Sequence, residues 1–299
     1  MTNRTIAIMM PGDMGHAVGR VLREHGHDVF TCLQGRGEHS HTLSRSAGLR
    51  EVDTWADVVD QADMILSILP PAAAIDLASG IAALMQELGK TPLYVDCNAV
   101  SPDTAQKVAA IITAAGAPFI DTGIIGMAPG KVANSEGPRF YVSGPELSAM
   151  LALDGQGIRV IEAGENYGEA SGLKMTYAGL TKGTWTLHTA VLLAAKRLGV
   201  LDTLLQEFAF SQSAALSAMR AQVPFIPADS ERWIGEMEEI ASTLSDAGVT
   251  SGFHDGAAEI FRLLAKTPLA RETRADMDRS RSLEDALSIY EEYLPKQDQ

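Results

Sequence analysis

The sequence predicts an α/β domain with a doubly wound parallel sheet, followed by an all-α domain. Apolar strand-like runs alternate with helical segments through the first half, as is typical of parallel sheets covered by helices. After about residue 165 the strand-like runs end and helical periodicity fills the chain. A chain of 299 residues exceeds the usual size of one domain, so we expect two, 1–165 and 166–299.

In the first half, each expected strand is a short apolar run. Thr5–Met9 is the first, and Asp63–Leu69 ends at two prolines, as expected of a parallel strand buried on both faces. Residues 54–62 form a short polar segment. The other expected strands are 28–33, 92–97, 118–121 and 140–143, and the expected helices are 14–24, a helix start at 40–47, 72–88 and 102–115.

In the second half, helical periodicity is interrupted by proline and glycine, which end helices. The segment 173–201 is rich in apolar residues, but several lysines, an arginine and a histidine interrupt it. It therefore predicts a buried helix and not a membrane span. The expected helices are 170–198, 200–219, 230–247, 252–265 and 281–293.

The composition excludes several classes of partner. A net charge of −14 argues against nucleic-acid and anionic-membrane surfaces, since binding to phosphates requires a basic face. Cys32 and Cys97 lie in apolar runs, and their spacing suggests neither a disulfide framework nor a metal site. The chain starts without a signal-like apolar stretch. We expect a cytoplasmic protein without a metal.

The segment RTIAIMMPGDMGHAVG, residues 4–19, contains the most informative motif. A strand followed by glycines and a helix start forms an anion site, because the helix N-terminus directs unpaired N–H groups at a phosphate. Gly12 and Gly15, with Asp13 and Met14 between them, match two glycines of G-x-G-x-x-G, and Met10 replaces the first. Although such a match can be only a turn, its position predicts a Rossmann dinucleotide-binding domain.

The end of the second strand indicates which dinucleotide binds. An NAD-selective chain places a carboxylate there for the ribose 2′-hydroxyl, but residues 31–37 contain none; Asp28 comes too early and Glu38 too late. Arg36 could instead pair with a 2′-phosphate, unless it is only a solvated loop arginine. We therefore expect NADP, with NAD as the alternative.

Other polar groups and glycines follow the next expected strands. DMILSILPP ends at Leu69 and Pro70, which we expect beside the cofactor, and DCNAVSP places Asn98 at a neighbouring strand end. Asn98 could contact nicotinamide or substrate, or form an Asx turn before a helix. FIDTGIIGMAPG contributes Gly123 and Gly126, whose amides could hold a carboxylate, or which could belong to a flexible loop.

Lys174, in GEASGLKMTYAGLTKG, is the strongest catalytic candidate. It lies where the helical half begins, and Tyr177 and Thr181 share its helix face at i+3 and i+7. A lysine beside apolar surface and a cationic cofactor ring is a plausible general base, although most helix lysines are surface charges. His254, at a later helix start, could contact substrate or be an ordinary buried or capping histidine.

These segments together resemble the β-hydroxyacid dehydrogenase superfamily, which includes 3-hydroxyisobutyrate dehydrogenase, tartronate semialdehyde reductase and 6-phosphogluconate dehydrogenase. MPGDMG stands at the family's G-L-G-x-M-G turn, DCNAVSP at its D-x-S-T-x-x-P, and DTGIIGMAPG at its D-A-P-V-S-G-G. SGLKMTYAG stands at its catalytic G-x-x-x-K-x-x-N-N helix. The resemblance is closest to a little-characterised phosphogluconate-dehydrogenase-like branch.

The resemblance implies that Lys174 takes the hydroxyl proton while hydride passes to the nicotinamide. It also implies a substrate carboxylate held by the DTGIIG backbone and Asn98, and a homodimer or higher homo-oligomer. Ile125 replaces the family's serine, Ala178 replaces an asparagine, and Tyr177 takes the preceding site. These changes predict a different, bulkier or less polar acid.

We therefore expect an NADP-preferring oxidoreductase that interconverts a small hydroxy acid and its oxo acid, with Lys174 as acid and base. One alternative on the same fold is reduction of an imine or ketone. The other is a regulator that binds the cofactor without turning over a substrate. It stays an alternative because Met10 and the replaced serine and asparagine depart from the family's motifs.

Overall fold

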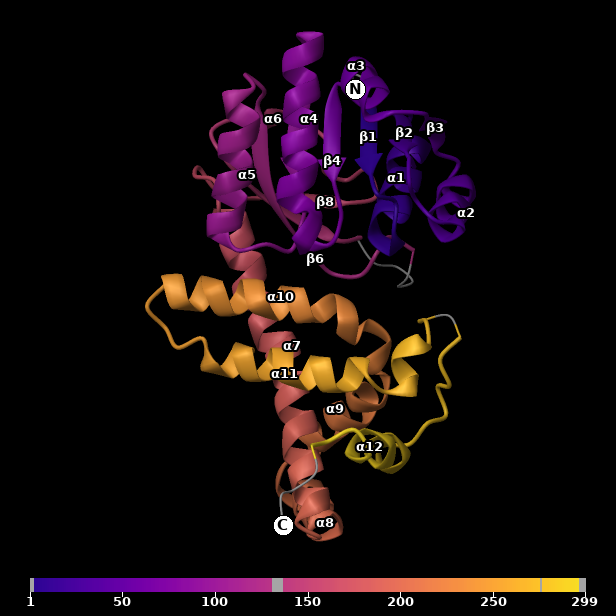
Figure 1. Cartoon of the computed structure of the whole chain (residues 1–299), viewed down its shortest axis with the longest axis vertical. Helices are drawn as coiled ribbons and strands as arrows, with labels where there is room; N and C mark the ends of the chain where they lie inside the picture. Colours follow the sequence, from indigo (N-terminus) through magenta and orange to yellow (C-terminus); the bar gives the residue numbers. More distant parts are fainter. Residues whose placement is uncertain (1–2, 131–136, 275, 296–299) are drawn as a thin grey trace. The chain divides into compact units, whose positions relative to one another are not determined.

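The computed structural model describes residues 3–130, 137–274 and 276–295. It divides into two compact units, Met1–Met175 and Thr176–Gln299, each described here by itself (Figure 1). The division lies inside helix α7 (Glu169–Arg197), later than the 165/166 boundary expected from the sequence. The first turns of this helix therefore belong to the α/β unit.

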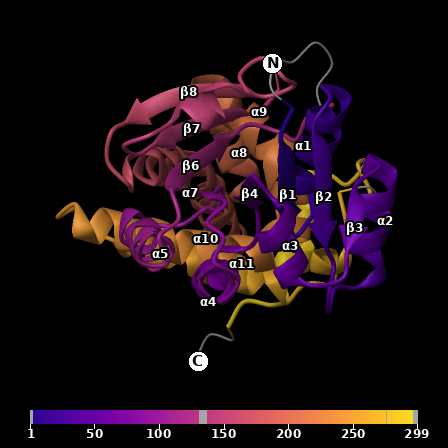
Figure 2. The same ribbon diagram turned by 90° about the horizontal axis from the view of Figure 1, so that it is seen from above.

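An eight-stranded sheet in the order β3-β2-β1-β4-β5-β6-β7-β8 forms the centre of the first unit (Figure 2). Neighbouring strands are parallel except β6 and β7, which pair antiparallel. The strands are β1 Thr5–Met9, β2 Asp28–Cys32, β3 Arg50–Val52, β4 Met64–Ser67, β5 Leu93–Asp96, β6 Phe119–Ile125, β7 Arg139–Ser143 and β8 Arg159–Gly164. The predicted doubly wound sheet is confirmed.

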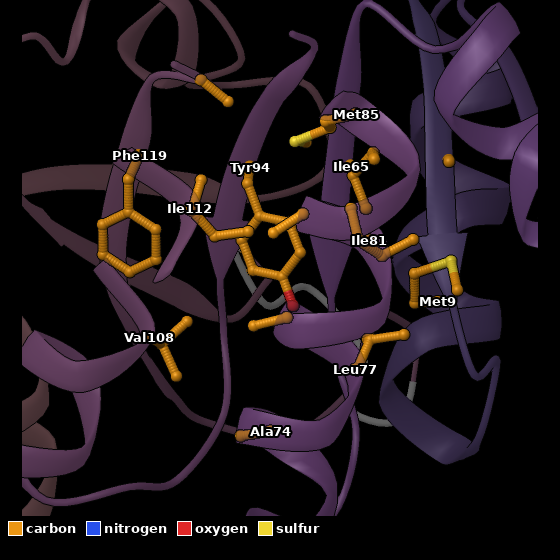
Figure 3. Packing of buried hydrophobic residues seen from close by; sticks show 14 of the residues in the cluster. Met9, Ile65, Ala74, Leu77, Ile81, Met85, Tyr94, Val108, Ile112 and Phe119 are labelled. Carbon is orange, nitrogen blue, oxygen red and sulfur yellow. The ribbon is translucent and has the colours of Figure 1, made fainter. Parts of the chain in front are cut away.

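Helices cover both faces of this sheet and bury two apolar clusters against it. On one face, α3 (Trp55–Gln61), α4 (Ala74–Leu88) and α5 (Pro102–Ala114) contribute to a single cluster. Figure 3 shows side chains of this cluster from strands and helices, with Tyr94 of β5 close to Ile112 of α5. On the other face lie α1 (Asp13–Glu24), α2 (Glu38–Ala47) and α6 (Ser148–Leu151).

Three elements of this unit differ from the sequence prediction. The segment 54–62, expected only as a short polar segment, contains α3, because Thr54 and Asp57 form a reciprocal capping box. Strands β3 and β8 were not expected, because β3 has only three residues and neither strand contains a continuous apolar run. Both lie at edges of the sheet, where burial is incomplete.

The second unit is helical over its described residues. Helices α10 (Pro227–Asp246) and α11 (Gly252–Ala265) lie side by side (Figure 1). Trp233 of α10 packs between Trp185 of α7 and Phe261 of α11, with ring centroids at 5.3 and 5.4 Å. The remaining elements are α8 (Leu201–Ser211), α9 (Ser213–Gln222), α12 (Leu283–Glu291) and the short 3-10 helices η2 (Val223–Phe225) and η3 (Pro268–Arg271).

In the second unit, one expected helix is divided into two, while the expected all-α character holds. The expected single helix 200–219 is divided at Gln212, whose backbone leaves the helical region with ψ 47°. The all-α character itself is confirmed for the described part of the chain. Within the same described residues, no helix combines the length and apolarity that crossing a membrane requires.

Met10 adopts a backbone conformation that favours glycine. Its φ is 58°, in the left-handed region, and it is the only non-glycine residue with positive φ among the described residues. A side chain there costs about 1–2 kcal/mol. Met10 is therefore the position at which the chain keeps the glycine geometry of the motif without the glycine.

We expect Met10→Gly to be about 1 kcal/mol more stable than Met10→Ala, because both variants lose the side chain but only glycine relieves the positive φ. Urea unfolding of the two variants measures the difference. At Ala17, inside α1, the order should reverse, with Ala17→Gly about 0.5–1 kcal/mol less stable than wild type. A Met10→Ala variant as stable as Met10→Gly would contradict the strained backbone.

Candidate functional site

The carboxyl ends of β1, β4, β5 and β6 lie next to one another along the C-terminal edge of the sheet, which is the edge where the parallel strands end. The strand order reverses between β1 and β4, because the chain builds β2 and β3 on one side of β1 and β5 and β6 on the other. In open α/β sheets, ligands bind outside the carboxyl ends of strands at this reversal. The predicted site residues of the first half therefore converge on one edge.

The glycine turn after β1 has the geometry of a phosphate site. Gly12 is the N-cap of α1, and among the described residues no side chain caps this helix end. A Cβ on Gly12 would meet no atom within 4 Å, so its face is open. A Cβ on Gly15 would lie 3.2 Å from Ile8 and 3.3 Å from the Met10 carbonyl oxygen. Gly15 thus allows α1 to pack on β1, while Asp13 and Met14 begin the helix.

Arg36 lies in the loop after β2, next to the start of α2. Its side chain is exposed, and its N–H donates to the Leu33 carbonyl at 2.9 Å in a tight turn. Gly37 is the N-cap of α2, and no side chain of the described residues caps it. Because β2 is the neighbour of β1, a guanidinium and an uncapped helix end lie one strand away from the glycine turn.

Asn98 joins the ends of β4 and β5 and is almost completely buried. Its Oδ1 accepts the N–H of Leu69 at 2.8 Å, and its Nδ2 donates to Ser67 Oγ at 3.0 Å and to Asp96. These bonds hold the exposed Pro70 loop in place. A direct contact between Asn98 and a ligand would require this amide to give up an internal partner, so the structure favours a bracing role.

Two buried carboxyl groups face each other across neighbouring strands. Asp96 of β5 and Asp121 of β6 are register partners, and both side chains are inaccessible. Burial, together with the charge of Asp121, raises the pKa of Asp96 to about 8. Burial also raises the pKa of Asp121, but hydrogen bonds from Ser171, Ser143 and Gly168 oppose that shift. Burial therefore favours the protonated form of both carboxyl groups, and the donors around Asp121 work against it there.

Lys174 lies in the part of α7 that packs on β6. A Cβ on Gly123 would stand 2.6 Å from the Ala170 carbonyl oxygen and 2.8 Å from Lys174 Cβ. Only glycine allows the strand and helix to approach this closely. Beyond Gly123, Ile125 ends β6 with 3% exposure, and Gly126 is exposed with φ 118°. The predicted catalytic lysine and the predicted carboxylate-binding segment are therefore adjacent.

Tyr177, Thr181 and His254 belong to the second unit. Tyr177 is 49% exposed, and Thr181 Oγ1 donates to the Tyr177 carbonyl oxygen at 3.1 Å. His254 Nε2 lies 3.1 Å from the Gly179 carbonyl oxygen, in a close contact between α11 and α7. This contact supports the structural alternative for His254, and the substrate role of all three residues stays a prediction.

The sequence prediction missed several functional candidates. Asp121, Ser143 and Ser171 form a buried hydrogen-bonded group beside Lys174. In the sequence, this group was indicated only by an aspartate and a serine in the expected strands and a serine at the expected helix start. Lys182 of α7 forms a buried ion pair with Glu236 and lies 5.6 Å from the Trp233 ring centroid. No group of three or more metal-ligand side chains gathers within the described residues.

Comparisons with known protein families find a match in each half of the chain. Residues 5–152 match the family described as the NAD binding domain of 6-phosphogluconate dehydrogenase, and residues 195–264 match a domain of unknown function, DUF1932. An uncharacterised 28.5 kDa protein of Methanothermus fervidus is 29% identical over 179 residues, which are 60% of this chain and 66% of that protein.

The characterised relatives cover less of the chain. Human mitochondrial 3-hydroxyisobutyrate dehydrogenase is 29% identical over 143 residues, 45% of this chain and 39% of that enzyme. The chain thus spans less than two thirds of these relatives' length. The structure of Mycobacterium tuberculosis 3-hydroxyisobutyrate dehydrogenase with L-serine covers 96% of this chain and 99% of its own, with TM-score 0.66 and 17% identity. That likeness shows the shared fold.

The raised pKa of Asp96 makes stability depend on pH. A carboxyl group that binds its proton more tightly when folded stabilises the protein fully below its unfolded pKa, about 3.9. This contribution is lost as the pH rises towards the folded value of about 8. We expect Asp96→Asn to reduce the fall in unfolding free energy between about pH 5 and about pH 8.

Urea unfolding across this range measures the effect. The control is Asp103→Asn, because Asp103 forms an exposed ion pair with Lys107 at 2.6 Å and should leave the wild-type slope unchanged. Equal slopes for wild type and Asp96→Asn would show that Asp96 is ionised throughout the range.

Proposed function

Residues 5–152 belong to the family of NAD binding domains of 6-phosphogluconate dehydrogenase, and on that premise we propose an NADP-preferring oxidoreductase. The reaction is the interconversion of a small hydroxy acid and its oxo acid. One observation carries the proposal: Lys174 packs against Gly123 of β6, at the sheet edge where the glycine turn also ends. A proton-transfer group and a dinucleotide site therefore share one edge.

The residues at this edge fit a dinucleotide. The uncapped N-terminus of α1 offers backbone N–H groups to a pyrophosphate, and the open face of Gly12 gives room for it. Leu69 and Pro70, braced by Asn98, would lie beside the nicotinamide half. When bound, the nicotinamide supplies the hydride acceptor in oxidation and the hydride donor in reduction.

The protein's own chemistry is proton transfer and orientation. The Lys174 amine takes the hydroxyl proton during oxidation and returns a proton to the carbonyl oxygen during reduction. The exposed backbone at Gly126 is suited to a substrate carboxylate. Ile125 contributes no hydroxyl group where relatives have serine, which favours a less polar acid than the substrates of those relatives.

Two other functions compete with this one. An imine or ketone reductase would use the same fold, and a regulator would bind the dinucleotide without turnover. A screen of hydroxy acids, aldonic acids, ketones and imines with NADP and NAD, followed by absorbance of the reduced cofactor, separates them. Turnover of a hydroxy acid supports the proposal, and reduction of imines alone, or binding without any turnover, contradicts it.

We expect Lys174→Ala to lower kcat by about 10²–10⁴-fold, because a positioned proton-transfer group contributes that much. NADPH binding, measured by fluorescence, should stay within about threefold of wild type, since no hydride step is needed for binding. The matched control is Lys90→Ala, which removes an exposed lysine paired with Asp60. Undiminished turnover in Lys174→Ala would overturn the assigned role.

The preference for NADP rests on Arg36. Its exposed guanidinium and the N-terminus of α2 offer donors for a 2′-phosphate, and the first turn of α2 carries Glu38, which pairs with Arg45. An arginine fork matches a phosphate in two hydrogen bonds, whereas the 2′-hydroxyl of NAD offers no charge to it. NAD stays the alternative cofactor.

We expect Arg36→Ala to weaken NADPH binding about tenfold or more, since a charge-assisted hydrogen bond contributes about 1.5–3 kcal/mol. NADH binding should be unaffected. The control is Arg45→Ala, one helix turn or more away from the loop. The role of Arg36 would be refuted if the wild type bound NADH more tightly than NADPH. It would also be refuted if Arg36→Ala lowered the affinity for both cofactors equally.

We also propose a homodimer formed through α7, in line with the homo-oligomer expected from the resemblance. Exposed apolar side chains recur along α7 at separations of three, seven and four residues, which fit one seam of a coiled coil. Tyr177 is 49% exposed, Leu180 74%, Leu187 62% and Val191 37%. From 177 to 197 the helix contains no Asp or Glu, so a second copy of this acidic chain would meet no like-charge carboxylates there.

We expect the Leu180→Glu, Leu187→Glu double variant to be monomeric, because a symmetric seam would bring each new carboxylate against the partner's apolar stripe. Sedimentation velocity measures the mass, and far-UV circular dichroism checks the fold. The control is Leu88→Glu, an exposed leucine at the end of α4. A monomeric wild type, or a double variant that stays dimeric, would exclude this surface.

A further inference from the structure

We propose that Asp121 is a positioning residue that sets the place of Lys174 by fixing the first turn of α7 to the sheet. The inference rests on the proposed function for its catalytic consequence. Its evidence is a set of hydrogen bonds within the first unit, and Asp121 has no part in the proposed reaction itself.

The carboxylate of Asp121 receives four hydrogen bonds. Its Oδ2 accepts the N–H of Gly168 at 2.9 Å, the N–H of Ser171 at 3.1 Å and the hydroxyl of Ser143 at 3.0 Å. Its Oδ1 accepts the hydroxyl of Ser171 at 2.6 Å. The side chain is inaccessible, so these bonds are not shared with water.

Ser143 extends the same attachment. Its Oγ accepts the N–H of Ala170 at 3.0 Å while its hydroxyl donates to Asp121. Gly168, Ala170 and Ser171 belong to the start of α7, where backbone N–H groups have no partner within the helix. Asp121 and Ser143 together therefore satisfy the orphan donors of the helix that carries Lys174, and a carboxylate at this end also complements the helix dipole.

The attachment determines the position of Lys174 because the lysine follows one turn later. Ser171 and Lys174 are three residues apart and so share a helix face. Gly123, two residues after Asp121 on the same strand, lies on the same face of the sheet and approaches Lys174 Cβ closely. The helix is thus held by hydrogen bonds at Ser171 and by close packing at Lys174, and it has little freedom to turn or slide.

The neighbouring Asp96 differs from Asp121 in its hydrogen bonds. Burial favours the protonated form of both carboxyl groups and raises the pKa of each. Asn98 donates to Asp96, but the Asp96 Oδ2 has no hydrogen-bond partner among the described residues. Both oxygens of Asp121 accept hydrogen bonds, so Asp121 is the carboxyl group of the pair that holds the helix start.

The decisive comparison is between Asp121→Ala and Asp121→Asn in the full-length protein. Alanine removes all four acceptor contacts, whereas asparagine keeps one oxygen for the N–H groups of Gly168 and Ser171. We expect kcat to fall about 10²-fold in Asp121→Ala, since a misplacement near 1 Å has that effect, and about tenfold or less in Asp121→Asn. KM and the NADPH dissociation constant should change less than about threefold in both.

Hydrogen–deuterium exchange provides a readout that needs no substrate. We expect the peptide covering 168–175 to exchange at least about tenfold faster in Asp121→Ala, and the later part of α7 to be unchanged. Ser171→Ala removes one donor and should give a smaller change of the same kind, which keeps the test open if Asp121→Ala does not fold. The matched control is Asp103→Asn, in the first turn of α5, which should change neither readout.

The outcomes separate the two claims. Faster exchange at 168–175 with no turnover of any hydroxy acid in the wild type would support the attachment and refute the proposed function. Unchanged exchange at 168–175 in a folded Asp121→Ala or Ser171→Ala variant would overturn the inference. So would equal losses of kcat and of cofactor affinity, which indicate general destabilisation.

Discussion

The attachment of α7 to β6 is the interaction on which the candidate site depends. A buried carboxylate accepts hydrogen bonds from the start of the helix, and a glycine on the same strand lets the helix backbone approach. Without the carboxylate, the orphan N–H groups at the helix start would be buried without partners, at a cost of about 1–3 kcal/mol each. The position of Lys174 is therefore set by the sheet and not by the helix alone.

The other strand ends are fixed by comparable means. Asn98 connects β4 to β5 through its amide, and Gly15 lets α1 pack against β1. Asn98 and Gly15 are buried, whereas Gly12 and Pro70, close to them in these loops, are exposed. A site of this kind presents a few accessible groups on rigid elements, which is the arrangement that precise positioning requires.

The fold was predicted correctly where the pattern of neighbouring residues in the sequence determines the element. Apolar runs ending in proline or glycine gave the buried strands, and Gly12, Gly15 and Lys174 were located because their motifs stand at strand and helix ends. The prediction failed where long-range contacts decide. Strand β8 has no apolar run, and α3 depends on a capping box inside a polar segment. The roles of Asn98 and Asp121 come from partners 29 and 50 residues away, respectively, which spacing alone does not reveal.

In the proposed reaction, the β6–α7 attachment delivers Lys174 to the reacting oxygen of a hydroxy acid beside a dinucleotide. The most direct measurement is a crystal structure of the ternary complex with NADP and a bound hydroxy acid. We expect Lys174 Nζ at about 2.6–3.2 Å from the substrate hydroxyl oxygen, with the pyrophosphate at Gly12. A substrate bound with its hydroxyl beyond the reach of Lys174, or a pyrophosphate away from the glycine turn, would contradict it.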